Sequence, residues 1–213
     1  MSPSVRKSPP FSPSTRPGLR PSFYLRPTLV VARDLLGKYL VRSIGREVLA
    51  GRIVEVEAYR GKRDPASHTY RGKTKRNEVM FLEGGHLYVY FTYGMHFCAN
   101  VVTGPKGIGE AVLLRGIEPV AGLELMMKNR AFDKKRKDVW NLTNGPAKLC
   151  EAFGIARADN GSDLLNSRIT IVGARRSLKE EVVSSSRIGI RVGTEHRWRF
   201  YLHGNPWVSH HRK

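Results

Sequence analysis

The stretch LYVYFTYGMHFCAN, residues 87–100, alternates side chains with period two on both sides of a Tyr-Gly pair. This pattern predicts two short strands joined by a tight turn. Tyr88 and Tyr90 then share one strand face, while Tyr93 projects from the tip, where a ring is poorly placed for the core. Asn100 follows on the return strand, on a partly apolar face. Flat rings beside positive charge suit contact with an unstacked nucleic-acid base, although a packed aromatic hairpin has the same pattern.

Charge is the strongest signal in the composition. The 213 residues include 37 Lys and Arg against 18 Asp and Glu, a formal net charge of +19. Such an excess indicates a polyanionic partner, because each phosphate contact gains free energy by releasing counterions. Hydrophobic residues make up 40%, which is enough for one globular core and excludes a wholly disordered chain. A structural nucleic-acid binder would share this composition, so charge alone leaves catalysis open.

The ends and the cysteines place further limits on the class of protein. No apolar run approaches the ~20 residues of a membrane span, and the N-terminus lacks the apolar segment of a secretory signal. Residues 1–26 hold five Lys or Arg, six of the twelve prolines and no acid, so we expect a basic, disordered arm before one domain at residues 27–213. Cys98 and Cys150 lie outside any CxxC motif and in apolar settings, and we expect buried free thiols.

The rest of the chain alternates mainly between strand patterns. Strands are predicted at 38–44, 47–59, 110–119, 168–173, 186–193 and 198–202, besides the hairpin. Helices are predicted after Thr28 as N-cap, over residues 121–129, and from Pro146 to a stop at Gly154. The chain contains no internal repeat, P-loop or dinucleotide fingerprint.

The strand at 47–59 carries an unusual polar face. Glu55, Glu57 and Tyr59 alternate with Val54 and Val56, so they point to the same side. Charged strand residues usually face water, and a solvated face is the simpler interpretation. The floor of a binding site is the alternative.

Two basic features complete the set of candidates. Arg115 lies on an apolar strand, where burial of its guanidinium requires a carboxylate or phosphate partner. The loop at residues 60–76 has seven Lys or Arg against one Asp and is a candidate for contact with phosphates. His68 in this loop is, taken alone, more typical of a surface residue than of a catalyst.

Five sequence blocks occur in order: RIVEVEAYRGKRDPASH, LYVYFTYGMHFCANVV, AVLLRGIEP, NGPAKLC and GNPWVS. Together they resemble the alkyladenine type of 3-methyladenine DNA glycosylase, in the methylpurine DNA glycosylase family. The resemblance implies an α+β fold of one domain, a curved, mainly antiparallel sheet with peripheral helices, similar to formyltransferase C-terminal domains. It also implies a monofunctional enzyme that flips damaged purines from duplex DNA and hydrolyses the N-glycosidic bond without metal or cofactor.

The resemblance assigns the chemistry by position. Glu57 matches the general base that activates the attacking water, a step that needs a proton acceptor. Arg115 matches the arginine that helps to hold this water. Tyr59, His68 and Tyr90 match the residues that sandwich the flipped base, where stacked rings attract a cationic alkylated purine.

The resemblance also assigns the contacts with duplex DNA. Tyr93 matches the wedge that fills the gap left by the extruded nucleotide, and Met95 matches its neighbour at the tip. Asn100 matches the asparagine that clashes with the exocyclic amine of normal guanine. His96 stands where some members have tyrosine, which leaves its contact with DNA open. Glu55 has no matched role and keeps the interpretation of a solvated residue.

The expected partner is double-stranded DNA with damaged purines, bound by a monomer in the bacterial cytoplasm or a eukaryotic nucleus. The alternative function is a non-catalytic, basic nucleic-acid-binding protein, which would use the same surface without lesion preference. A glycosidase of free nucleosides conflicts with the charge of +19 and the tyrosine at the tip.

Overall fold

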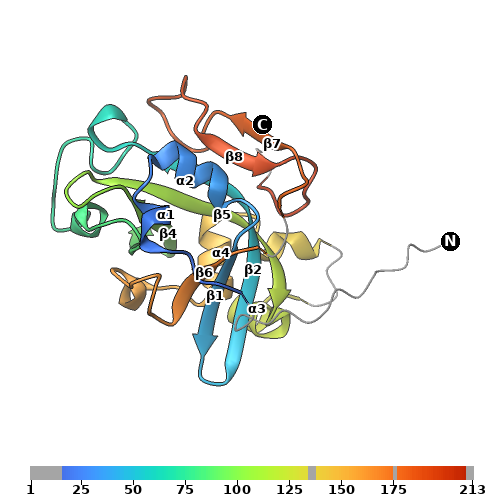
Figure 1. Cartoon of the computed structure of the whole chain (residues 1–213). Coiled ribbons are helices and arrows are strands. Elements are labelled where there is room, and N and C mark those ends of the chain that lie inside the picture. Colours follow the sequence, from blue (N-terminus) through green and yellow to red (C-terminus); the bar gives the residue numbers. More distant parts are fainter. Residues whose placement is uncertain (1–15, 134–137, 175–176, 210–213) are drawn as a thin grey trace.

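Strand β2 (Glu47–Tyr59) is the centre of the sheet, because it pairs with three other strands. β1 (Tyr39–Ile44) and then β8 (Arg199–Leu202) lie along one edge, and β5 (Glu110–Ala121) lies along the other. The register between β2 and β5 shifts at three places. Such bulges bend a strand and increase its twist. The sheet therefore curls into an antiparallel half-barrel (Figure 1).

The computed structural model describes residues 16–133, 138–174 and 177–209. Within these ranges the strand order is β3-β4-β5-β2-β1-β6, and β7 joins the sheet through β8. The remaining strands are β3 (Leu87–Thr92), β4 (His96–Thr103), β6 (Ile169–Val172) and β7 (Val182–Ser185). The predicted single α+β domain with a mainly antiparallel sheet is confirmed.

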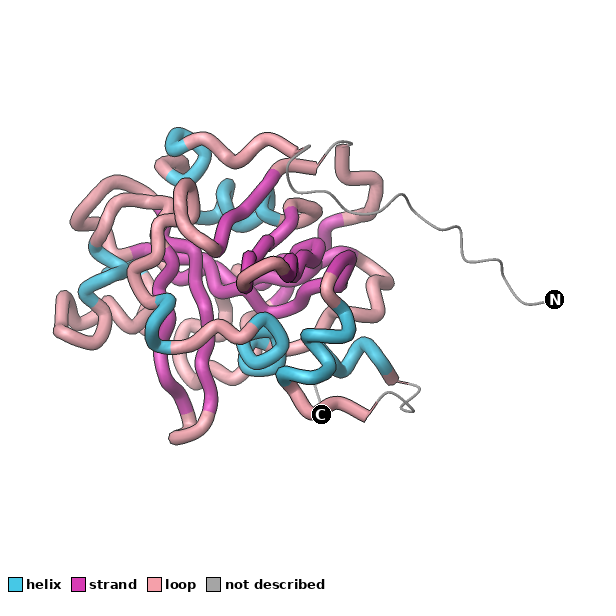
Figure 2. The backbone as a smooth tube through the Cα atoms, turned by 90° about the horizontal axis from the view of Figure 1, so that it is seen from below, coloured by secondary structure: helices cyan, strands magenta, loops and turns pink. Residues whose placement is uncertain are grey.

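The helices are short and surround the sheet (Figure 2). They are α1 (Pro21–Tyr24), α2 (Thr28–Leu35), α3 (Leu123–Asn129) and α4 (Pro146–Phe153), with 3-10 turns η2 (Gly61–Arg63), η3 (Glu78–Phe81), η4 (Val139–Leu142) and η5 (Arg157–Asp159). Helix α4 begins with Pro146 and ends at Gly154, whose φ of 65° gives the left-handed cap. Its Leu149 and Phe153 enter the same core as Leu35 of α2.

Ordered packing begins earlier than the expected boundary at residue 27. Tyr24 in α1 has 0% exposure, and its carbonyl accepts a 2.8 Å hydrogen bond from Gly104 N. Thr28 is the first residue of α2 and not its N-cap, which is Pro27. The Thr28 hydroxyl lies instead 2.9 Å from that of Thr103. Residues 1–15 of the predicted arm lie outside the described residues.

Two smaller predictions concern the cysteines and the membrane. Cys98 and Cys150 are buried free thiols, as expected. Burial raises the pKa of both thiols, so both are held as neutral, unreactive groups. Across the part of the chain that the structure describes, no helix is long and apolar enough to cross a membrane.

Candidate active site

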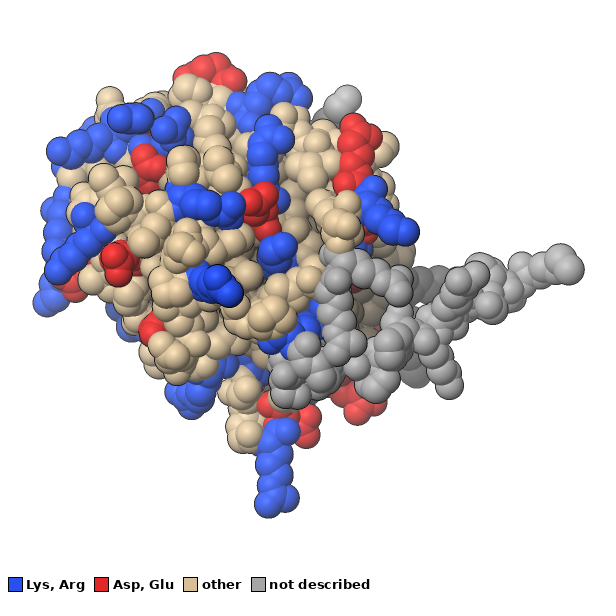
Figure 3. Space-filling view, in the orientation of Figure 1, with Lys and Arg blue, Asp and Glu red and all other residues tan. Residues whose placement is uncertain are grey.

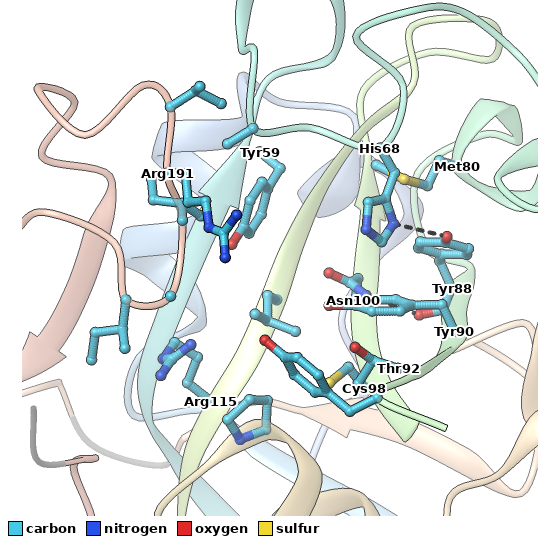
Figure 4. A pocket seen from close by; sticks show the side chains of 18 of the residues that line it. Tyr59, His68, Met80, Tyr88, Tyr90, Thr92, Cys98, Asn100, Arg115 and Arg191 are labelled. Atoms are coloured by element: carbon cyan, nitrogen blue, oxygen red, sulfur yellow. Dashed lines mark hydrogen bonds between the residues drawn. The ribbon is translucent and has the colours of Figure 1, made fainter. Parts of the chain in front are cut away.

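A pocket of about 450 Å³ lies between the end of β2, the β3–β4 hairpin and residues 188–192 (Figure 4). The candidates that line it are Tyr59, His68, Tyr90, Tyr93, Asn100 and Arg115. They come from four separate stretches of the chain, which the curl of the sheet brings together. Two further candidates lie outside the lining: Glu57 lies behind Tyr59, and Met95 lies beyond the rim at the hairpin tip.

One wall of the pocket is a cluster of three rings. Tyr88 and Tyr90 point to the same side of β3 and stack with centroids 5.6 Å apart. His68 packs edge-on against Tyr90 at 4.5 Å, and its Nδ1 lies 3.1 Å from the Tyr88 hydroxyl oxygen. Tyr59 stands across the pocket from this cluster (Figure 4). The space between these aromatic walls suits a flat ligand.

The hairpin supplies both the floor and the rim of the pocket. Asn100 is 5% exposed, and its Nδ2 donates a 3.2 Å hydrogen bond to the Tyr88 carbonyl, which fixes the amide. At the tip, Tyr93 and Gly94 both have positive φ, 50° and 66°, as hairpin turns of type I′ require. A tyrosine in this region costs about 1–3 kcal/mol, so its placement is imposed by the turn. Tyr93 is 84% exposed and Met95 69%, as expected for a tip that does not join the core.

Glu57 has 0% exposure, so the solvated interpretation of this residue is wrong. Its Oε2 accepts a 2.9 Å hydrogen bond from the Tyr59 hydroxyl, and its Oε1 accepts a 2.7 Å bond from Ile188 N. Arg115 Nη1 lies 3.4 Å from the same Oε1. This confirms the predicted carboxylate partner of the buried arginine.

Glu55 also has 0% exposure, which overturns its assignment as a solvated residue. Its Oε1 accepts from Arg115 Nε at 3.2 Å, Arg199 Nε at 2.6 Å and Ser209 Oγ at 2.7 Å. Its Oε2 accepts from Ser209 N at 2.7 Å. Two guanidinium groups and two neutral donors therefore offset the cost of burying this charge.

The two buried carboxylates differ in what they can still do. An ionised carboxylate offers about four acceptor sites. The donors from Arg115, Arg199 and Ser209 fill those of Glu55. Glu57 has two short hydrogen bonds and a longer ion pair, so it keeps capacity to accept a proton. Of the two, Glu57 is the carboxylate with acceptor capacity left.

The segment at residues 186–193 was predicted as a strand, and this prediction is wrong. The strand is β7, which ends at Ser185, and the residues after it form a loop along the pocket. The Ile188 N–H bonds to Glu57 and not to a neighbouring strand. Gly189 and Gly193 have positive φ, 76° and 65°, which breaks the extended backbone. These two glycines within eight residues were the sequence signal that could have indicated a loop.

Arg187 ties this loop to the loop after β2. Its Nη1 and Nη2 donate to the two carboxylate oxygens of Asp64 at 2.5 and 2.7 Å, and both side chains have 0% exposure. The guanidinium also stacks between Tyr59, at 4.6 Å, and Trp198, at 5.1 Å. Sequence reasoning assigned no role to either residue. The pair packs against Tyr59 and links the two loops.

The ionisable rings of the pocket are neutral at physiological pH. Burial raises the pKa of Tyr88 to about 12, and it also raises the pKa of Tyr59 and of Tyr90 above the usual value. Burial, followed by the charge of Arg76, lowers the pKa of His68 below its usual 6.5. The aromatic walls are therefore uncharged and face a ligand with their π-electrons.

The chain is strongly basic, and arginines reach the site. Lys and Arg outnumber acidic residues over the visible face of the molecule (Figure 3), in line with the totals of 37 and 18. Arg76 and Arg191 line the pocket itself. Among the described residues, no group of three or more His, Cys, Asp or Glu could hold a metal ion. An aromatic slot at a basic surface is typical of enzymes that act on a base turned out of a nucleic acid.

Comparisons with known proteins identify the family. The model of the family described as methylpurine-DNA glycosylase matches residues 22–206. A Carboxydothermus hydrogenoformans protein, provisionally named 3-methyladenine DNA glycosylase, is 50% identical over 188 residues, covering 88% of this chain and 96% of that protein. Proteins of the same name from Burkholderia lata and Methanoculleus marisnigri are each 49% identical, over 88% of this chain and 89% and 96% of theirs. The chain belongs to the methylpurine-DNA glycosylase family and is a DNA glycosylase of DNA repair.

Proposed function

We propose that this protein releases 3-methyladenine and related damaged purines from double-stranded DNA by hydrolysing the N-glycosidic bond with a water activated by Glu57. The observation that carries the proposal is the buried Glu57 carboxylate, which retains acceptor capacity directly behind the Tyr59 ring of the pocket. Hydrolysis needs such a group, because water is a weak nucleophile until its proton has an acceptor. The product is an abasic site.

The flipped purine stacks between Tyr59 and the wall of His68 and Tyr90. Neutral rings attract a cationic alkylated purine through cation–π contact, which selects 3-methyladenine over an undamaged base. Neutral lesions such as hypoxanthine depend on stacking and hydrogen bonds alone. Asn100, whose amide is fixed at the pocket floor, excludes the exocyclic amine of guanine.

Glu57 is not among the residues that line the pocket. The reacting water must therefore reach its carboxylate beside a residue that both lines the pocket and contacts Glu57. Arg115 and Ile188 meet this condition, since each lines the pocket and contacts Glu57 Oε1. Arg115 holds the water on the side of the sugar. The Ile188 N–H bond fixes the carboxylate in one orientation, which lowers the cost of reaching the reactive geometry.

The exposed tip of the hairpin enters the duplex. Tyr93 fills the gap left by the flipped nucleotide, and Met95 contacts the adjacent base pair. Lys and Arg around the pocket bind the phosphates. We further propose that the enzyme acts as a monomer in the cytoplasm; relatives from bacteria such as Burkholderia lata support the compartment.

The enzyme releases the base by hydrolysing its N-glycosidic bond and leaves the DNA strand intact. Strand cleavage by glycosylases of the bifunctional kind requires an amine that forms a Schiff base with the sugar. No lysine is present among the described residues that line the pocket. Borohydride should therefore trap no covalent adduct with lesion DNA.

A base-release assay tests the proposal. A hypoxanthine-containing duplex is incubated with the protein and then treated with alkali, which cuts abasic sites. Glu57→Gln should bind this duplex with near-native affinity and release base about 10²–10⁴-fold more slowly, the contribution of a general base. Glu151 is an exposed glutamate of α4 that pairs with Arg130. Glu151→Gln is therefore the matched control and should keep native rates. Native activity in Glu57→Gln would refute the role of Glu57, and binding without base release by the native protein would favour a non-catalytic binder.

A further inference from the structure

Arg115 is shared between two buried carboxylates. Its Nε donates to Glu55 Oε1 at 3.2 Å, and its Nη1 lies 3.4 Å from Glu57 Oε1. Its Nη2 donates to Ser209 Oγ at 3.4 Å. Each edge of the guanidinium is thus directed to a different group. A two-point ion pair with Glu57, the strongest arrangement that arginine forms with a carboxylate, is absent from the described contacts.

Glu55 is itself held in place from the far end of the chain. Arg199 Nε donates to its Oε1, and Arg199 Nη2 donates to the Ser209 carbonyl at 3.1 Å. Ser209 N and Oγ fill the remaining acceptor sites of Glu55. The carboxylate is therefore immobile and its charge is balanced by two arginines.

The approach of the C-terminal segment depends on Gly116, the residue after Arg115. A Cβ at Gly116 would lie 2.6 Å from the Trp207 carbonyl oxygen, closer than any side chain allows. A larger residue would push the segment with Trp207 and Ser209 away from Glu55. The cluster is a built feature of the fold and not a chance contact of surface side chains.

We propose that Glu55 is a positioning residue for base release: it takes the Nε edge of Arg115, so that only one edge faces Glu57 and the Glu57 carboxylate stays basic enough to accept a proton. The inference rests on the proposed role of Glu57. A closer or two-point pair with Arg115 would stabilise the Glu57 anion and weaken it as a base.

The surroundings of Glu57 allow this effect to be measured. The groups that face it are Tyr59 on its own strand, Tyr90 and Cys98 from the hairpin, Arg115 from β5, and Arg199 opposite it on β8, with the Ile188 N–H from the loop. Burial raises the pKa of Tyr59, Tyr90 and Cys98, so these three stay neutral at acid pH. The arginines stay charged. The acid limb of the single-turnover rate then reports chiefly on Glu57, with His68 as the other group that titrates in the pocket.

The test is the pH profile of Glu55→Gln in single-turnover base release from a hypoxanthine duplex. Without the Glu55 charge, both arginines act on Glu57 and stabilise its ionised form. The acid limb should move to lower pH by about one unit, and the plateau rate should fall roughly threefold as the base weakens. The dissociation constant for lesion DNA should change by less than about twofold, because no pocket contact is lost. An acid limb that stays in place or moves to higher pH would overturn the proposal.

Two further variants separate charge from structure. Ser209→Ala removes the hydroxyl contacts with Glu55 and Arg115 but keeps every charge, so the acid limb should stay in place even if the thermal midpoint falls. Arg199→Gln removes a cation, so that Arg115 is the only arginine left to pair with Glu55 among the described contacts. Less positive charge then acts on Glu57, and the acid limb should move to higher pH. If Glu55→Gln does not fold, Arg199→Gln carries the test, and an unmoved or lowered limb would contradict the proposal.

Failure of this inference and failure of the proposed function give different results. In Glu57→Gln the acid limb that belongs to the base should vanish. A limb that persists there refutes the role of Glu57. A limb that vanishes there but does not move in Glu55→Gln refutes only the role of Glu55.

Discussion

The Tyr59 hydroxyl donates a 2.9 Å hydrogen bond to Glu57 Oε2, two positions earlier on β2. Alternate residues of a strand point to the same face, so one strand presents both a pocket ring and the carboxylate behind it. Burial, followed by the Glu57 charge, raises the pKa of Tyr59. The phenol therefore remains a donor at physiological pH. Through this hydrogen bond, a ring that lines the pocket directly contacts Glu57, the proposed general base.

Tyr59→Phe should separate these two roles. The variant keeps the stacking ring but removes a hydrogen bond that stabilises the ionised form of Glu57. The acid limb of single-turnover base release should therefore move to higher pH, while affinity for lesion DNA changes by less than about twofold. Tyr59→Ala also loses the ring and should bind lesion DNA about tenfold more weakly. Equal losses of affinity in both variants would show that the hydroxyl, and not the ring, binds the base.

Tyr93→Ala should weaken binding to duplex DNA without affecting folding. Its ring is 84% exposed, so its removal costs no core contact. Loss of an inserted ring costs about 1–3 kcal/mol, or roughly 5- to 150-fold in affinity for a lesion duplex. Fluorescence anisotropy and thermal unfolding measure the two quantities. Ile44→Ala, which truncates another partly exposed apolar side chain at the β1–β2 hairpin, should change neither.

The hairpin and the central strand were predictable from the sequence, because their signals are local. Period-two alternation and a Tyr-Gly pair define β3 and β4, and the same alternation puts Glu55, Glu57 and Tyr59 on one face. The burial of that face was not predictable in this way. Two of the residues that stabilise the Glu55 carboxylate, the cation Arg199 and the neutral donor Ser209, lie 144 and 154 residues further along the chain.

The loop along the pocket is a second feature that local sequence patterns did not predict. Residues 186–193 alternate as a strand does, but the Ile188 N–H bonds to a side chain 131 residues away. A backbone donor that is satisfied by a distant carboxylate leaves no trace in local periodicity. The strand pattern left Glu57 between a solvated face and a site floor, and only the resemblance to a family gave it a catalytic role; the contacts of Arg199, Ser209 and Ile188 with the two carboxylates came from the structure alone.

Asp64→Asn should destabilise the protein more than any exposed charge change. Asp64 and Arg187 form a two-point pair with 0% exposure. Neutralising one partner leaves a buried charge uncompensated, at a cost of about 3–5 kcal/mol. Denaturant unfolding measures this loss. Asp34→Asn breaks the Arg26–Asp34 pair, whose side chains are 37% and 49% exposed, and should cost less than about 1 kcal/mol.

His68 should make the affinity for charged lesions depend on pH. Burial and the charge of Arg76 lower its pKa below 6.5, so the ring is neutral at physiological pH and becomes an imidazolium only as pH falls through this lowered value. The added charge repels a cationic purine but not a neutral one. Affinity for a duplex with a cationic alkylated purine, stabilised by a 2′-fluoro sugar, should therefore fall as the pH is lowered below about 6.5, and more than affinity for a hypoxanthine duplex. Binding is measured in the Glu57→Gln background, so that the base stays attached. His68→Phe keeps a ring and removes the titration, so the difference between the two duplexes should no longer vary with pH. If it varies as before, the charge that senses the lesion lies on another residue.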